Sequence, residues 1–597
     1  MFYYTREGFT LKKEHNHTKP NFLFIIVDEE RFPMGYENEE LSEWRKKHLK
    51  THNLLQENSM NFLNHYVGST ACTPSRATLF TGQYPSLHGV SQTPGAAKDT
   101  YDPDVFWLDP NTVPTLGDYF RAAGYRTYWK GKWHISSEDI LIPGTHDALP
   151  SYDVDTGEPN SKNERIYEEA NRLDGYGFSG WIGPEPHGSD PRNSGSSAAT
   201  GVNGRDTVYA DEVVSLLEDL EEEHSNENDP WLIVSSFVNP HDITIFGLFT
   251  RLLPDYNFDI DSSIPDIPPA PTASESLRTK PTAQASYRDT YQKSLQPTVD
   301  SNFMRQLYFS LQKEVDNEMF KVYQALQKSI FSDNTIVVFT SDHGDLLGAH
   351  GRLFQKWHNA YEESIHVPFI IHSPKLFSGK KETSMLTSHV DVIPTLLGLA
   401  DISVGDVQKK LSKDHSEVHP LVGRDLTPLL YENEEFHRAD EALYFMTDDE
   451  FSRGMHQETL LGEPYESVSQ PNHMETVITK LKTGENHSEE IWKLSRYFDN
   501  PQFWSDPGVE DQVLTAKSSI PISDNSEAVI NVKTTKTEPV PEEYELYNLT
   551  KDPYEEKNLA HSQHETKETK FIKKTLINML EKQSGKKRLV PKNKNNN

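Results

Sequence analysis

The sequence is constrained most by its short, nearly continuous apolar runs, each of which is followed by polar residues. These runs occupy residues 21–28, 231–238, 335–340 and 368–372. Apolar runs of this length are typical of strands that are buried on both faces of a parallel sheet. Apolar residues at helical spacing over 311–328, and again over 388–400, predict helices that alternate with the strands. The expected fold class is α/β, with a large mixed, mainly parallel sheet flanked by helices.

The length and the change of pattern along the chain predict more than one domain. At 597 residues the chain is too long for one simple core. We assign residues 1–440 to a large first domain, with insertions at about 143–204 and 253–300 that we expect to lie on the surface and shape the mouth of a pocket. Residues 441–585 are expected to form a smaller α+β domain, and residues 586–597 a basic, disordered tail.

Composition excludes several classes of protein. The formal net charge of -32 argues against a nucleic-acid partner, because a polyanion would be repelled by most of the surface. The single cysteine excludes an intrachain disulfide and a multi-cysteine metal site. No apolar run approaches the ~20 residues that span a bilayer, so we expect no membrane association. The first 21 residues lack the apolar core of a secretory signal, so the expected location is cytoplasmic.

Chemistry-bearing residues follow three of the predicted strands. Asp28 ends the first run, His241 follows the second, and Asp342 and His343 follow the third. Because the carboxyl ends of strands in an open parallel sheet form the edge where ligands bind, these side chains are expected to face one site. The lone Cys72 precedes Thr73-Pro74, which can open a helix, and a cysteine at that position favours a thiolate or a bound anion. The competing interpretation is that a lone cysteine is a small core residue.

The segment from Ala71 to Gly82, ACTPSRATLFTG, resembles the signature of the type I sulfatases in the alkaline phosphatase superfamily. Further similarity covers about 21–400 and 544–559. The resemblance implies an alkaline-phosphatase-like fold in which residues 1–440 are the catalytic domain. It also implies that a transient maturase partner oxidises Cys72 to formylglycine, an aldehyde (3-oxoalanine) that is hydrated to a diol.

The resemblance further implies a divalent cation, most often Ca²⁺, with Mg²⁺ or Mn²⁺ as alternatives. Its ligands would be Asp28, Glu29, Cys72 (as the diol), Asp342 and His343. Glu29 departs from the Asp or Gln that is usual at this position in the family. The ligand chemistry agrees, since oxygen-rich donors with one imidazole suit these cations better than a closed zinc site.

The remaining catalytic residues are also carried over from the resemblance. Arg76 would stabilise the ionised hydroxyl, Lys132 of Gly-Lys-Trp-His would offset charge on the sulfuryl oxygens, and His134 would remove the second hydroxyl's proton. His241 or Lys356 would protonate the leaving group. Other histidines are assigned to structural or rim positions: His88, His350, His358, His366 and His389. Asp345 is assigned to a loop.

The resulting hypothesis is an arylsulfatase-like enzyme that hydrolyses an aryl, alkyl or sugar sulfate monoester to an alcohol and sulfate. A phosphonate or phosphate ester hydrolase of the same superfamily is the alternative, because such relatives share the formylglycine and the Asp-His pair. A catalytically silent binding protein is a third hypothesis, but it would be expected to have lost Cys72, Lys132 or His134. The sequence sets neither the natural substrate nor the oligomeric state.

Overall fold

A computed structural model describes residues 19–186, 190–224, 229–431, 441–501, 511–522, 526–534 and 539–592. Its main sheet has seven strands in the order β3-β4-β1-β5-β6-β2-β7. The strands are β1 (Asn21–Asp28), β2 (Ser59–Tyr66), β3 (Arg126–Gly131), β4 (Trp231–Pro240), β5 (Thr335–Ser341), β6 (Phe369–His372) and β7 (Lys380–Ser388).

The sheet is mixed and mainly parallel, as the sequence predicts. β1 runs parallel to β4 and β5, β3 parallel to β4, and β2 parallel to β7. The fourth predicted strand, β6, is antiparallel to both of its neighbours. The apolar run alone does not reveal strand direction, because a strand buried on both faces has the same pattern either way.

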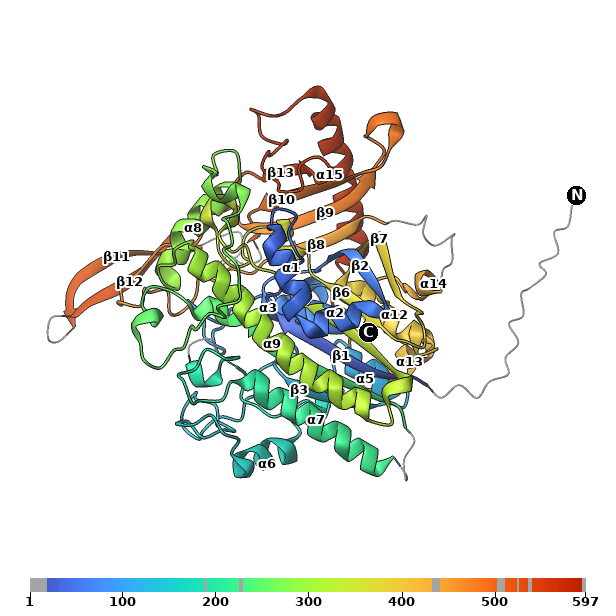
Figure 1. The fold of residues 1–597 in the computed structure, drawn as a ribbon. Coiled ribbons are helices and arrows are strands. Elements are labelled where there is room, and N and C mark those ends of the chain that lie inside the picture. Colours follow the sequence, from blue (N-terminus) through green and yellow to red (C-terminus); the bar gives the residue numbers. More distant parts are fainter. Residues whose placement is uncertain are drawn as a thin grey trace, which may run out of the picture.

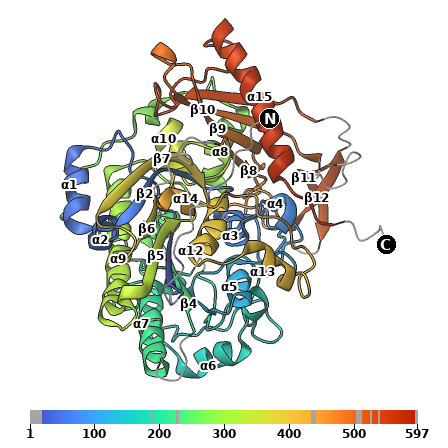
Figure 2. The same ribbon diagram turned by 90° about the vertical axis from the view of Figure 1, so that its right-hand side faces the viewer.

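Helices cover both faces of this sheet because its central strands are apolar on both faces. Along β1, Phe22, Phe24 and Ile26 belong to one core cluster, whereas Leu23, Ile25 and Val27 belong to another. The first cluster includes α3 (Cys72–Thr81), α5 (Leu116–Ala122), α12 (Val392–Leu399) and α13 (Val404–Leu411). The second includes α2 (Lys50–Glu57), α7 (Arg205–Glu223) and α9 (Asn302–Lys328). Figure 2 shows the two layers on opposite sides of the strands.

Two helices differ from the predicted bounds. The helix expected over 311–328 is the second part of α9, which begins at Asn302 and is capped by the Ser301 side chain. The segment expected over 388–400 is one turn of 3-10 helix followed by α12. The other helices are α1 (Glu39–His48), α4 (Pro85–His88), α6 (Ser161–Ala170), α8 (Thr282–Ser294), α10 (Ala349–Arg352), α11 (Glu362–Ile365), α14 (Thr427–Leu430) and α15 (Lys567–Lys587).

The C-terminal part contains a four-stranded antiparallel sheet with one covering helix (Figure 1). Its order is β13-β10-β9-β8, with β8 (Leu443–Thr447), β9 (His473–Leu481), β10 (Glu490–Phe498) and β13 (Glu543–Asn548). Ile572, Leu576 and Leu580 of α15 pack in the same cluster as Val477 and Leu494 of the sheet. β11 (Asp511–Ile522) and β12 (Ser526–Thr534) form a separate two-stranded ribbon. The α+β character expected here is confirmed.

The two predicted insertions and the predicted tail contain regular structure. α6 lies within 143–204, and α8 lies within 253–300, where Tyr287 and Tyr291 are buried in a core cluster. α15 extends two residues into the tail that was expected to be disordered from 586, and the backbone N–H of Lys592 donates to Glu417 at 3.0 Å. Residues 593–597 lie outside the described residues. In the described part of the chain, no helix combines the length and apolarity needed to cross a membrane.

Candidate active site

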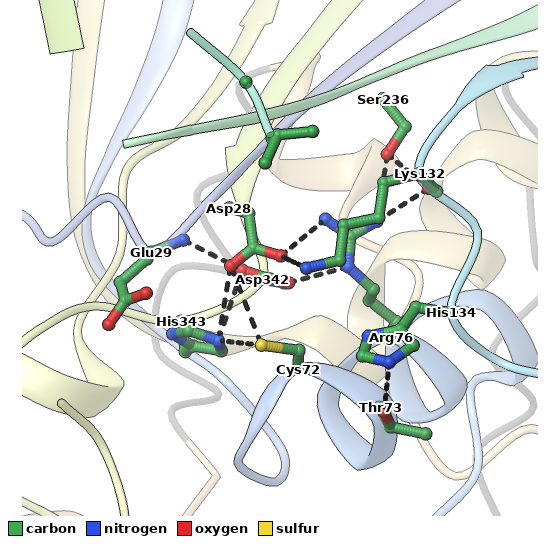
Figure 3. Close-up of polar contacts among 12 residues, drawn as sticks. Asp28, Glu29, Cys72, Thr73, Arg76, Lys132, His134, Ser236, Asp342 and His343 are labelled. Carbon is green, nitrogen blue, oxygen red and sulfur yellow. Dashed lines mark hydrogen bonds and ion pairs between the residues drawn. The ribbon is translucent and has the colours of Figure 1, made fainter. Parts of the chain in front are cut away.

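The predicted strand ends meet at one edge of the main sheet. β1 lies between β4 and β5, so Asp28, His241 and Asp342 follow three adjacent strands. The N-terminus of α3 points at the same edge and carries Cys72 as its first residue. Figure 3 shows Cys72 facing Asp28, Asp342 and His343. The structure therefore brings together residues that are far apart in sequence, such as Cys72 and His343 at a separation of 271 positions.

Four buried residues form a group that could hold one metal ion. Potential ligand atoms of Asp28, Cys72, Asp342 and His343 all lie within 4.8 Å of one another. The Sγ of Cys72 lies 3.0 Å from Nε2 of His343 and 3.7 Å from Oδ1 of Asp28. Nδ1 of His343 lies 3.0 Å from the Gly344 carbonyl oxygen, and a hydrogen bond there leaves Nε2 directed at the centre.

The two carboxylates divide their oxygens between the centre and a buried cationic layer. Oδ1 of Asp28 and Oδ1 of Asp342 lie 3.6 and 3.7 Å from Nε2 of His343. Oδ2 of Asp28 is bound by Lys132 Nζ at 2.5 Å and Arg76 Nη2 at 3.2 Å, and Oδ2 of Asp342 is bound by Arg76 Nε at 2.7 Å. The cationic side chains thus fix the orientation of both carboxylates and leave one oxygen of each facing Cys72.

The pKa values of the two carboxyls are shifted in opposite directions. Burial, and next the charge of Asp28, raise the pKa of Asp342 to about 7. Burial also opposes ionisation of Asp28, but Lys132 and then His241 and Arg76 hold its pKa well below the ordinary value. A hard divalent cation between the Oδ1 atoms would relieve this repulsion, so the donor set of two carboxylates and one imidazole fits Ca²⁺, Mg²⁺ or Mn²⁺.

The environment of Cys72 favours the protonated thiol over the thiolate. Burial, and next the charge of Asp28, raise the pKa of its thiol far above the ordinary value. Of the two outcomes expected at this helix start, a thiolate or a bound anion, the thiolate is disfavoured, because desolvation and the facing carboxylate oppose ionisation of the thiol. An unmodified thiol at this position would be a poor nucleophile.

Glu29 occupies a different position from the other predicted ligands. Its backbone has φ of 74°, and its N–H donates to Oδ1 of Asp342 at 3.1 Å. Its Oε2 accepts from Lys356 Nζ at 3.1 Å, and Figure 3 shows the carboxylate turned away from Cys72. Glu29 forms a second potential metal group with Asp28 and His241, with ligand atoms within 4.8 Å. The longer side chain thus places its carboxylate beside the Lys356 ammonium.

The predicted lysines and histidines surround the same centre. Lys132 and Lys356 are each 1 % exposed, so both ammonium groups are desolvated and paired with Asp28 and Glu29 respectively. His241 is half-buried, and burial followed by the charge of Lys132 lowers its pKa well below the ordinary value. His134 is also half-buried, with Nε2 3.4 Å from the Thr73 hydroxyl, beside the nucleophile position.

Two residues that the sequence patterns did not indicate support this arrangement. The buried Glu185 carboxylate accepts from the backbone N–H of Trp133 at 3.1 Å and of His134 at 2.8 Å. The Ser236 hydroxyl accepts from Arg76 Nη1 at 2.9 Å and donates to the Lys132 carbonyl at 2.7 Å (Figure 3). Ser236 stands inside an apolar strand, which is a detectable signal, whereas Glu185 lies in a loop with no pattern around it.

The residues assigned to structural positions stay outside the four-residue group. His350 contacts Glu275 and Glu363, and His389 Nε2 lies 3.1 Å from the Ser341 carbonyl oxygen. Asp345 accepts from the Leu347 N–H within its own loop.

The family is shown by comparison with known proteins. A family model described as Sulfatase matches residues 20–402. The chain belongs to the sulfatase family, and it is a sulfuric ester hydrolase. Members of this family use a metal ion and formylglycine.

Individual proteins with sulfatase names match this chain at moderate sequence identity. The protein named uncharacterized sulfatase YidJ of Escherichia coli (strain K12) is 27% identical over 398 residues, covering 65% of this chain and 69% of that protein. Choline-sulfatase of Rhizobium meliloti (strain 1021) is 28% identical over 403 residues, again covering 65% and 69%. The crystal structure of phosphonate monoester hydrolase of Agrobacterium radiobacter shares the fold with a TM-score of 0.55 at 17% identity, covering 96% of each chain.

Proposed function

We propose that this sulfatase acts on a sulfate monoester through a formylglycine made from Cys72 by a maturase, on a divalent cation held by Asp28, Asp342 and His343. The observation that carries the proposal is the close group of these four residues, with one oxygen of each carboxylate facing residue 72. Calcium is the proposed ion, because oxygen donors dominate the set.

The cation and the formylglycine would supply chemistry that the unmodified side chains lack. The cation would polarise a sulfate oxygen and favour ionisation of a neighbouring hydroxyl. The hydrated aldehyde would supply two hydroxyls on one carbon, one as a nucleophile towards sulfur and the other as the group whose ionisation would release sulfate. A serine at position 72 would lack the second hydroxyl.

The chain's own residues orient and charge the site. Arg76 and Lys132 hold the outer oxygens of Asp28 and Asp342, which keeps the inner oxygens in place for the cation. The ammonium of Lys132 and that of Lys356 offset charge that develops on the sulfuryl oxygens in a dry site. His134, beside Thr73 and held by Glu185, would accept the proton of the second hydroxyl.

Two groups are candidates to protonate the leaving alcohol. His241 is half-buried and therefore reachable by substrate, and Lys356 lies on the Glu29 side of the same centre. Separate His241→Ala and Lys356→Ala variants would be assayed with phenyl sulfates of rising leaving-group pKa. The residue that donates the proton is the one whose loss slows poor leaving groups more than good ones.

The sulfate preference is tested against the phosphonate alternative. The Asp342-His343 pair is compatible with both activities, and sulfate and phosphate esters share their shape. Comparison of kcat/KM on p-nitrophenyl sulfate and phenyl phosphonate separates them. A higher value on the sulfate supports the proposal, and a higher value on the phosphonate overturns it. A panel of aryl, alkyl and sugar sulfates would then define the leaving group.

A further inference from the structure

The C-terminal domain reaches the chain just before Cys72. At the end of β8, the backbone N–H of Met446 donates to the Gly68 carbonyl at 3.1 Å, and the Thr447 hydroxyl donates to the Thr70 carbonyl at 2.5 Å. Through these two contacts, residues 68–70 lie alongside β8 of the four-stranded sheet. The backbone that leads into α3 is therefore held from outside the catalytic sheet.

Asp449, two residues after β8, makes the most direct of these contacts. Its side chain is nearly inaccessible, at 3 % exposure. Oδ2 accepts from the backbone N–H of Ala71 at 3.1 Å, from the Thr93 hydroxyl at 2.6 Å and from Trp357 Nε1 at 3.1 Å. Oδ1 accepts from the backbone N–H of Thr93 at 3.0 Å. One carboxylate thus gathers four donors from three separate segments.

The donors flank the two residues that the proposed reaction uses. Ala71 immediately precedes Cys72, and Trp357 immediately follows Lys356. Ala71 is the N-cap of α3 and has no side chain that could cap the helix. The Asp449 carboxylate supplies an acceptor and a negative charge at this helix start, where both are favourable.

The Trp357 side of the contact is equally constrained. The Trp357 ring stacks on Phe451 with centroids 4.7 Å apart and an interplanar angle of 26°. Nζ of Lys356 lies 5.0 Å from the Trp357 ring centroid. Displacement of the indole would therefore displace the ammonium that faces Glu29 and residue 72.

We propose that Asp449 is a positioning residue that sets residue 72 and Lys356 relative to each other, so that the C-terminal domain completes the active site. The inference rests on the proposed function, in which these two residues act on the same sulfate ester. Asp449 itself does not touch the reacting atoms; it acts through Ala71 and Trp357.

The test compares Asp449→Asn with Asp448→Asn in the full-length, maturase-treated enzyme. Asp448 is a matched control, because it is an adjacent buried carboxylate whose Oδ1 lies 3.0 Å from His473 Nδ1, away from residue 72. In Asp449→Asn, the amide NH₂ replaces one acceptor oxygen and must face groups that donate to the Asp449 carboxylate in wild type. If this change shifts residue 72 or Lys356 by up to about 1 Å, kcat should fall by about tenfold to a hundredfold.

Three readouts separate positioning from general stability. The formylglycine content of each variant is measured by mass spectrometry, kcat is expressed per converted site, and the rate is followed across p-nitrophenyl, p-chlorophenyl and phenyl sulfate. Positioning predicts that Asp449→Asn lowers kcat per converted site and steepens its dependence on the leaving group, whereas Asp448→Asn changes neither. Equal kcat and slope in Asp449→Asn and wild type overturn the inference.

A second variant decides the question should Asp449→Asn fail to fold. Trp357→Phe removes one donor to Asp449 and keeps an aromatic ring for stacking on Phe451. Positioning predicts a lower kcat per converted site with unchanged formylglycine content, and a wild-type kcat per converted site overturns it. Failure of the proposed function is recognised separately, because the wild-type enzyme would then be active with residue 72 unconverted.

Discussion

Removal of Arg76 is the perturbation whose cost can be worked out most directly from the structure. Its guanidinium is fully buried and donates to Asp342 Oδ2, Asp28 Oδ2, the Lys132 carbonyl and the Ser236 hydroxyl at 2.7 to 3.2 Å. Breaking a buried ion pair by removing one partner costs about 3–5 kcal/mol, because the remaining charge is left uncompensated. Arg76→Ala should lower the free energy of unfolding by about this amount.

The assay is urea denaturation of wild type and Arg76→Ala, each in EDTA and in Ca²⁺. The loss should be larger in EDTA, because a cation between the carboxylates offsets part of the exposed repulsion. Arg126→Ala is the control: Arg126 pairs with Glu223 at 2.7 Å near the surface, and such pairs contribute about 0–1 kcal/mol. If the unfolding free energies of Arg76→Ala and Arg126→Ala differ by less than about 1 kcal/mol, the buried Arg76 ion pairs contribute no more than a surface pair.

Three further outcomes are expected. EDTA should abolish turnover, and Ca²⁺ should restore it. Asp342→Asn should raise the Ca²⁺ concentration needed for half-maximal activity. Equal Ca²⁺ requirements in Asp342→Asn and wild type would contradict the assignment of Asp342 as a ligand. Burial opposes protonation of His350, but carboxylates led by Glu363 raise its pKa to about 9. Protonated His350 should therefore stabilise the folded state by about 3 kcal/mol. This stabilisation is fully present below pH 6.5 and is lost as the pH rises to about 9. The unfolding free energy of wild type should fall across that range, and His350→Gln should flatten the fall. Gly131→Ala should destabilise the fold, because a Cβ there would lie 1.8 Å from the Ser236 carbonyl oxygen at φ of +95°. The backbone shift that relieves this contact should move the neighbouring Lys132 and lower kcat/KM. An unchanged kcat/KM would show that Gly131 does not help to position Lys132.

The strands that carry the site could be predicted because their signal is local. β1, β4 and β5 are apolar throughout and end in polar residues, and parallel strands place those ends at one edge. This pattern is sufficient to predict that Asp28 and His343 share a site. The assignment of Cys72 to the same centre came from the resemblance, since spacing alone allowed an ordinary core cysteine.

The remaining parts depend on tertiary contacts that leave no local pattern. The direction of β6 is set by its partners, and the burial that raises the pKa of Cys72 is a property of the assembled core. Asp449 meets Ala71 across 378 positions of sequence, and an acidic residue in a loop usually lies on the surface. Contacts of this kind join segments that are far apart in the sequence, so no local pattern announces them.

In the proposed mechanism, turnover depends on residue 72 as an aldehyde hydrate beside a cation. It is tested most directly by preparing the protein with different degrees of maturation and measuring, for each preparation, the kcat on p-nitrophenyl sulfate and the fraction of the residue-72 peptide whose mass corresponds to formylglycine. We predict that kcat rises in proportion to the converted fraction and passes through zero for unconverted protein. Full activity in protein that carries only the thiol would contradict it.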